Sequence, residues 1–67
     1  EQYVIYAHCQ SVQSRIGINV PDFMEGLGLE IVEQTDGAQL LTSTIQNGQF
    51  FVNYNTDEAN YIVLKTK

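Results

Sequence analysis

The feature that most constrains the fold of this chain is a series of short segments rich in β-branched and aromatic residues, separated by residue pairs typical of tight turns. These segments are residues 29–35, 38–46, 49–55 and 61–65. Residues of this kind favour strands. The pairs Asp36-Gly37 and Asn47-Gly48 are dipeptides preferred in two-residue hairpin loops. We therefore expect four consecutive strands in an antiparallel meander.

A fifth strand is expected at residues 3–9, where no strand-breaking residue occurs. Side chains alternate between the two faces of a strand, and both faces of this segment are largely apolar. One face has Tyr3, Ile5, Ala7 and Cys9, and the other has Val4, Tyr6 and His8. Two apolar faces are typical of a central or covered strand. This segment is free to pair with residues 61–65.

One short helix is expected at about residues 21–27. Pro21 suits the first helical position, where its missing N–H costs nothing, and Asp22 complements the positive helix start. Gly28 provides a stop. Residues 10–19 are interpreted as a polar connection with a few apolar anchors.

These elements predict a small, mainly β fold, with an α+β arrangement as the alternative. The expected architecture is a five-stranded antiparallel sheet or a partly closed SH3-like barrel, with the helix near residues 21–27. We expect residues 1–67 to form a single small domain. The barrel is a statement about shape alone, because a fold of this kind does not carry a function.

A chain of 67 residues buries only about 60% of the surface that its unfolded form exposes, so its stability is marginal without additional support. A single cysteine, Cys9, cannot form an internal disulfide. One His and one Cys cannot supply the four ligands of a structural zinc site. A dense core, oligomerisation or both are left as sources of stability.

The charge of the chain is −5, and its acids are concentrated away from its bases. Arg15 is the last base before Lys65, and seven acids lie between residues 16 and 64. Phosphate backbones and anionic lipids attract Lys and Arg, so we expect no direct nucleic-acid binding and no membrane association. No apolar run approaches the ~20 residues of a membrane helix. A protein partner with a basic surface is the natural one, although acids that only keep the domain soluble are the alternative.

No arrangement of residues predicts catalysis, a metal site or a cofactor. His8 and Cys9 are neighbours in an expected strand, so their side chains point to opposite faces and cannot form a nucleophile–base pair. The turn that begins at Asn53 has oxygen ligands at alternate positions, as a calcium loop does. However, Glu58 and Leu64 stand where that loop requires Gly and Glu.

Three of the five expected strands are apolar on both faces, which is more apolar surface than one sheet and a short helix can cover. We therefore expect an exposed apolar patch with aromatic side chains, a feature typical of interaction sites. The alternative is that residues 10–20 cover this surface with Val12, Ile16 and Ile18. The candidate partner-binding residues are Phe51, Tyr54, Tyr61, Glu30, Glu33 and Asp36.

The leading functional hypothesis is a non-enzymatic protein-interaction module, such as a small acidic inhibitor, adaptor or accessory subunit, that occludes a surface of its partner. A structural homo-oligomer that uses the surplus apolar sheet face is the first alternative. An acidic mimic of nucleic acid is the second. The lone cysteine favours a reducing compartment such as the cytoplasm, while the compartment and the partner stay open.

Overall fold

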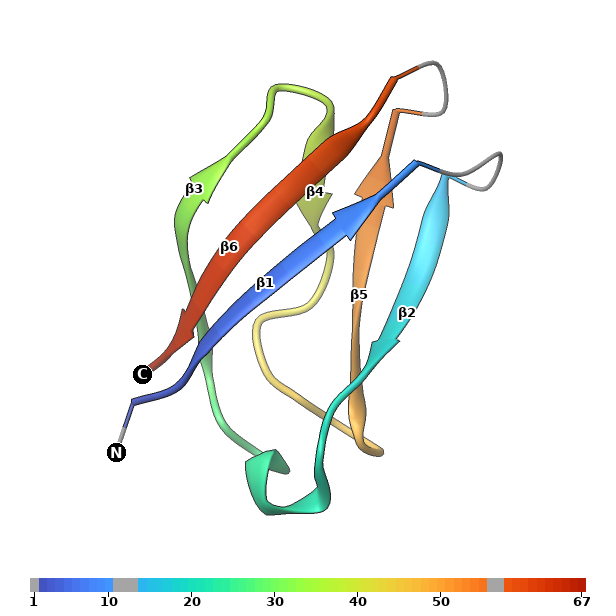
Figure 1. The fold of residues 1–67 in the computed structure, drawn as a ribbon. Helices are drawn as coiled ribbons and strands as arrows, with labels where there is room; N and C mark the ends of the chain where they lie inside the picture. Colours follow the sequence, from blue (N-terminus) through green and yellow to red (C-terminus); the bar gives the residue numbers. More distant parts are fainter. Residues whose placement is uncertain (1, 11–13, 56–57) are drawn as a thin grey trace.

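The chain folds into two three-stranded antiparallel sheets that face each other as a sandwich (Figure 1). The computed structural model describes residues 2–10, 14–55 and 58–67. The elements are β1 (Val4–Cys9), β2 (Arg15–Asn19), the 3₁₀ turn η1 (Asp22–Met24), β3 (Leu29–Gln34), β4 (Ala38–Leu40), β5 (Gln49–Tyr54) and β6 (Asn60–Thr66). The mainly β class predicted from the sequence is therefore confirmed. No helix in the described ranges is long and apolar enough to cross a membrane.

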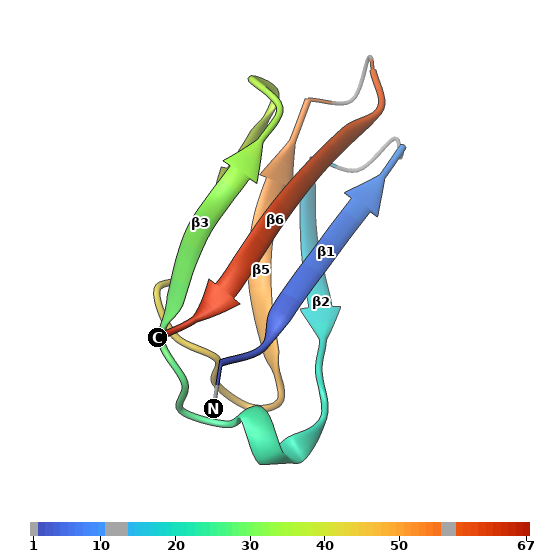
Figure 2. The ribbon, with the colours of Figure 1, turned by 60° about the vertical axis from the view of Figure 1, so that its left-hand side comes forward.

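The first sheet has the strand order β1-β6-β3, so the first and last strands of the chain pair as expected. The β1–β6 register runs from Val4 opposite Lys65 to Cys9 opposite Asn60. The β3–β6 register shifts between Ile31 and Glu33, which marks a β-bulge. In Figure 2 this sheet lies in front, with β6 between β1 and β3.

The second sheet has the order β2-β5-β4 and covers the inner face of the first. Alternate residues of β5 and β6 are buried, as the two-residue period of a strand requires. The core residues with no exposed surface are Ile45, Phe50, Val52, Ile62 and Leu64. Two inner faces packed in this way exclude water from both sheets at once.

The expected meander is wrong at two of its three connections, because β3 and β4, and likewise β5 and β6, belong to different sheets, whereas β4 and β5 pair as expected. β3 and β4 are separated by the turn at Asp36-Gly37, yet β3 pairs with β6 and β4 pairs with β5. The chain crosses between sheets because the inner faces of β5 and β6 are both apolar and need an opposing layer. The described ranges contain six strands in place of the expected five, and the two sheets do not close into a barrel. The strand expected at 38–46 ends at Leu40.

Residues 10–19 are not only a connection, because their second half forms β2. Ile16 and Ile18 alternate with exposed neighbours and pack against the core. This is the two-residue period of a half-buried strand. Val12 lies outside the described residues. The part of this segment that is described adds a strand to the second sheet and leaves the outer face of the first sheet uncovered.

The helix expected at 21–27 shrinks to the single 3₁₀ turn η1. Glu25 already has extended backbone angles, φ −56° and ψ 132°, and Gly26 has a positive φ of 82°. Helical hydrogen bonding therefore stops after Met24, whose side chain is buried. Such a short piece is held by packing and not by its own hydrogen bonds.

The turn at Asn47-Gly48 is confirmed, and it explains the role of Glu25. Both turn residues have positive φ angles, 58° and 73°, which is the backbone that the Asn-Gly pair favours. The N–H groups of Asn47 and Gly48 donate to the two carboxylate oxygens of Glu25, at 2.9 and 2.8 Å. One side chain thus fixes a turn 22 residues further along the chain.

Candidate functional site

The outer face of the β1-β6-β3 sheet exposes a cluster of apolar and aromatic side chains, which we call the tyrosine face. Its residues are Val4, Tyr6, His8, Tyr61 and Val63. The register places Tyr6 opposite Val63 and His8 opposite Tyr61. Val4 is 73% exposed and Tyr6 is 62% exposed. An exposed apolar cluster is therefore present on the folded chain, as the apolar character of both faces of β1 and β6 led us to expect.

Aromatic rings make contact across the tyrosine face. The ring centroids of Tyr6 and Tyr61 are 5.8 Å apart and tilted by 46°. The rings of Tyr6 and His8 are nearly parallel, with centroids 6.4 Å apart. Tyrosine combines a large apolar body with a polar tip, and it is enriched at protein interfaces for that reason.

Two carboxylates border this face on the β3 side. The hydroxyl of Tyr61 donates a hydrogen bond to Glu33, and this bond together with the negative charge of Glu33 raises the pKa of Tyr61 above its ordinary value of 10.0. Glu30 forms an ion pair with Lys65, with 3.4 Å between nitrogen and oxygen. The border therefore has one carboxylate that is already paired with a cation and one that is not engaged with Lys or Arg among the described residues.

The outer face of the β2-β5-β4 sheet has a different chemistry. The guanidinium of Arg15 lies 4.7 Å from the centre of the Phe51 ring. The ring in turn lies across Gly17, where an added Cβ would come within 2.9 Å of it. Phe51 is therefore occupied in covering a strand glycine, an arrangement known to rescue such positions. The register places Arg15 and Gln39 on either side of Asn53, and the N–H of Leu41 donates to the carbonyl of Phe51.

The structure brings together three of the six predicted binding residues, namely Tyr61, Glu30 and Glu33. Phe51 lies on the other sheet. Tyr54 lies in the core, where it is 3% exposed and its hydroxyl donates to the carbonyl of Ala7 at 3.0 Å. Side chains alternate along β5, so Tyr54 points to the same inner face as Phe50. Asp36 is exposed in the turn between β3 and β4.

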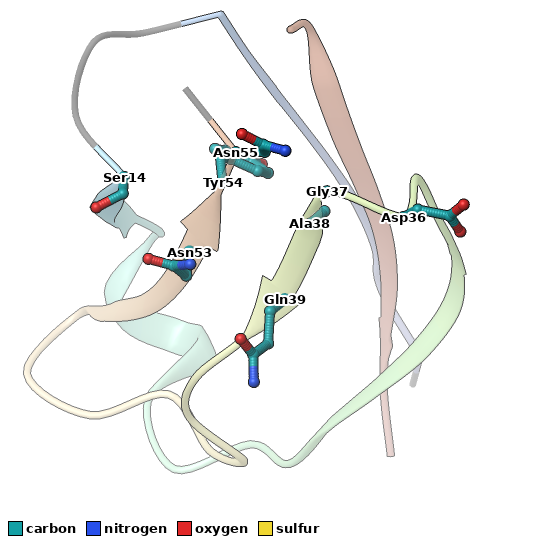
Figure 3. Close-up of a pocket in the computed structure, with 8 residues that line it drawn as sticks. All are labelled: Ser14, Asp36, Gly37, Ala38, Gln39, Asn53, Tyr54 and Asn55. Carbon is teal, nitrogen blue, oxygen red and sulfur yellow. The ribbon is translucent and has the colours of Figure 1, made fainter. Parts of the chain in front are cut away.

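A polar hollow of about 440 Å³ lies at one end of the second sheet (Figure 3). Its lining residues are Ser14, Asp36, Gly37, Ala38, Gln39, Asn53, Tyr54 and Asn55. Asp36 is the only carboxylate among them, and Figure 3 shows it turned away from Gln39 and Asn53. The hollow offers amides but no pair of acids for general acid–base chemistry.

Sequence reasoning did not single out Tyr6, Val4 and Val63 as site residues. The signal was nevertheless available, because the expected pairing of residues 3–9 with residues 61–65 places their outward side chains on one face. No group of three or more His, Cys, Asp or Glu residues that could hold a metal ion occurs in the part of the chain that the structure describes.

Comparison with known proteins gives no functional assignment. No protein-family model, no curated protein and no solved structure matches this chain. Function is therefore inferred from the two outer faces of the sandwich and from their chemistry.

Proposed function

We propose that the chain is a non-enzymatic protein-interaction module that binds its partner through the tyrosine face. The observation that carries this proposal is the exposure of Val4 and Tyr6 on a sheet whose inner face is already buried. Contact with these residues would remove apolar surface from water and supply affinity. An inhibitor, an adaptor and an accessory subunit all act by occupancy of this kind.

A partner with a basic surface fits the border of the tyrosine face. Glu33 is exposed beside Tyr61 and its carboxylate is held by the Tyr61 hydroxyl, so its position is set before a partner arrives. The chain as a whole has a charge of −5. These charges would steer a basic partner and repel acidic ones, while the apolar centre holds the complex together.

Binding is favoured over catalysis by the chemistry of the surface. The polar hollow of Figure 3 contains one carboxylate, and the five residues that define the tyrosine face include one histidine and no Ser, Thr or Cys. A nucleophilic or acid–base site needs two or more groups within hydrogen-bond reach. The described residues provide a surface that could bind a partner and cover part of it.

The acidic mimic of nucleic acid has less support from the geometry. Such a mimic needs rows of free carboxylates, as along a phosphate backbone. Glu25 is used to fix the turn at Asn47-Gly48, and Glu30 is paired with Lys65. The exposed acids that are left are spread over separate elements.

Site-specific photo-crosslinking tests the proposal. A photo-reactive phenylalanine analogue replaces Tyr61 in one variant. In the matched control it replaces Gln39, which is exposed on the outer face of the other sheet. We expect position 61 to give a heteromeric adduct of one discrete mass, and we expect its yield to fall as salt is added.

The control position decides whether the adduct is specific. Equal yields at the two positions, or no heteromeric adduct at position 61, would contradict the tyrosine face as the binding surface. A homodimeric adduct is recognised by its mass, twice that of the 7.6 kDa chain, and reports contact between two copies, not contact with a partner.

A further inference from the structure

β1 forms one edge of the first sheet, and among the described residues no strand pairs with its outer side. In the sheet order β1-β6-β3, β1 has a neighbour on one side only. The N–H of Thr66 donates to the carbonyl of Tyr3, so Tyr3 and Thr66 form a hydrogen-bonded pair. Hydrogen-bonded and non-hydrogen-bonded pairs alternate in antiparallel sheets. Val4, Tyr6 and His8 therefore direct their N–H and C=O groups away from β6.

The other three sheet edges have features that oppose the addition of a strand. β3 has a bulge and the charged residues Glu30 and Glu33. β4 has only three residues. β2 begins with Arg15 and has Gly17 at its centre. Charges, bulges and short length are the devices with which proteins protect sheet edges.

β1 has none of these protections. It is six residues long, it pairs with β6 without a register shift, and none of its side chains is Asp, Glu, Lys or Arg. Beside it lies an apolar hollow of about 280 Å³ between the two sheets. The hollow is lined by Tyr6, Ala7, His8, Ile16, Ile18 and Tyr54. A strand added to β1 would thus find both open hydrogen-bonding groups and an apolar surface.

We propose that β1 pairs antiparallel with β1 of a second copy, so that two sandwiches share one six-stranded sheet. With Tyr6 on the two-fold axis, Tyr6 faces Tyr6 of the second copy and Val4 faces His8. These three residues are the ones whose hydrogen-bonding groups point outward. On the inner face, Ile5 of the second copy lies beside Ala7, which lines the apolar hollow.

Charge favours this edge over others for contact between two copies of an acidic chain. Glu30 and Glu33 lie on β3, two strand spacings or about 10 Å from β1. In the second copy, Glu30 and Glu33 lie at the same distance from that copy's β1. Separations of this size exceed the screening length of about 8 Å at physiological salt, so repulsion between the two charges of −5 is weak at this edge.

Light scattering on a size-exclusion column, over a dilution series, measures the association of the chain. We expect a mass twice that of the 7.6 kDa chain at high concentration and the chain mass on dilution. Amide hydrogen exchange by NMR then identifies the edge. The amides of Val4, Tyr6 and His8 should exchange at least about tenfold more slowly in the dimer than in the monomer.

Two variants test the same edge. Tyr6→Lys places two like charges opposite each other on the axis, and Val4→Pro removes an outward N–H at the first residue of a strand, where proline is tolerated. Each should raise the dimer dissociation constant at least about tenfold. The control is Val32→Lys, since Val32 is 56% exposed on the opposite edge strand of the same sheet.

A chain that stays monomeric at every concentration would overturn the proposal. A dimer in which the amides of Tyr6 and His8 exchange freely would also overturn it, because that dimer uses another surface. If Val32→Lys weakens the dimer as much as Tyr6→Lys does, the β1 edge is not the contact. The exchange measurement on the unaltered chain keeps the test valid even if a variant does not fold.

Discussion

The two sheets bury similar apolar side chains on their inner faces but differ on their outer faces. On the outer face of the β2-β5-β4 sheet, the ring of Phe51 covers Gly17 and lies under Arg15. On the β1-β6-β3 sheet, Tyr6 is 62% exposed and contacts other rings of the same face. The first arrangement uses its aromatic residue for folding, whereas the second leaves aromatic surface in contact with water.

This difference separates aromatic residues that the fold uses from aromatic residues that it leaves exposed, a distinction that residue type alone does not make. An aromatic ring that covers a glycine is already satisfied within the chain. Tyr6 and Tyr61 lie on the outer face of a sheet whose inner face is already buried. Contact with another molecule would bury more of their surface. Substitutions of the two kinds of aromatic residue should therefore have unequal effects on stability.

Tyr54→Ala should unfold the chain or nearly so, whereas Tyr61→Ala should not. Tyr54 is 3% exposed and its hydroxyl links β5 to Ala7 in the opposite sheet. Loss of a buried aromatic side chain costs about 3–5 kcal/mol, which is a large part of the stability of a small domain. Urea unfolding followed by circular dichroism measures both variants. Equal stabilities would contradict the assignment of Tyr54 to the core.

Asn60→Ala should lower the free energy of unfolding by about 1–3 kcal/mol. Asn60 is 1% exposed and accepts from the Thr35 hydroxyl at 2.7 Å, while its amide donates to the carbonyl of Asn55 at 2.9 Å. The substitution leaves buried polar groups without partners. Thr35→Val, which removes the hydroxyl, is a matched comparison in the same urea assay. A loss within experimental error in Asn60→Ala would show that this network does not hold the end of the sandwich.

Phe51→Ala should cost about 1–2 kcal/mol, whereas Tyr6→Ala should change stability by no more than about 0.5 kcal/mol. Phe51 is half-buried over Gly17, and Tyr6 is largely exposed. Thermal unfolding at a concentration where the chain is monomeric compares the two. If Tyr6→Ala is the more destabilising substitution, the outer faces of the two sheets do not differ in the way described.

Glu33→Gln should lower the pKa of Tyr61 toward 10.0, because the hydrogen bond to Glu33 and its charge are what raise this pKa. Folding favours the protonated phenol, so this contribution to stability is fully present below the unfolded pKa. It is lost as pH rises through the higher folded pKa. Ultraviolet absorbance of tyrosinate measures the titration, and Glu30→Gln is the control. An unchanged titration in Glu33→Gln would contradict the hydrogen bond.

Much of the secondary structure could be predicted from the sequence. Turn dipeptides and alternating apolar residues identified most of β1, β3, β5 and β6, because these signals are local. The pairing of β1 with β6 followed from their matching apolar character. The partition into two sheets could not be predicted, since a hairpin and a crossing between sheets both begin with a turn at Asp36-Gly37.

The candidate site was predicted only in part for the same physical reason. Whether a residue on a doubly apolar strand faces inward depends on where the second sheet lies. Tyr54 and Phe51 were chosen by residue type, and burial then placed Tyr54 in the core. Tyr6 is not among the predicted binding residues, although the sequence places it on the same face of its strand as Val4 and His8. The polar composition of residues 10–19 indicates a connection, although Ile16 and Ile18 keep the two-residue period of β2.

Nitration of tyrosine, located by mass spectrometry on the dilute monomer, tests the central division most directly. If Tyr6 belongs to an exposed face and Tyr54 to the core, Tyr6 is nitrated readily while Tyr54 is protected until the chain unfolds. A Tyr6 that is as unreactive as Tyr54 in the folded monomer, or a Tyr54 as reactive as Tyr6, would contradict the account.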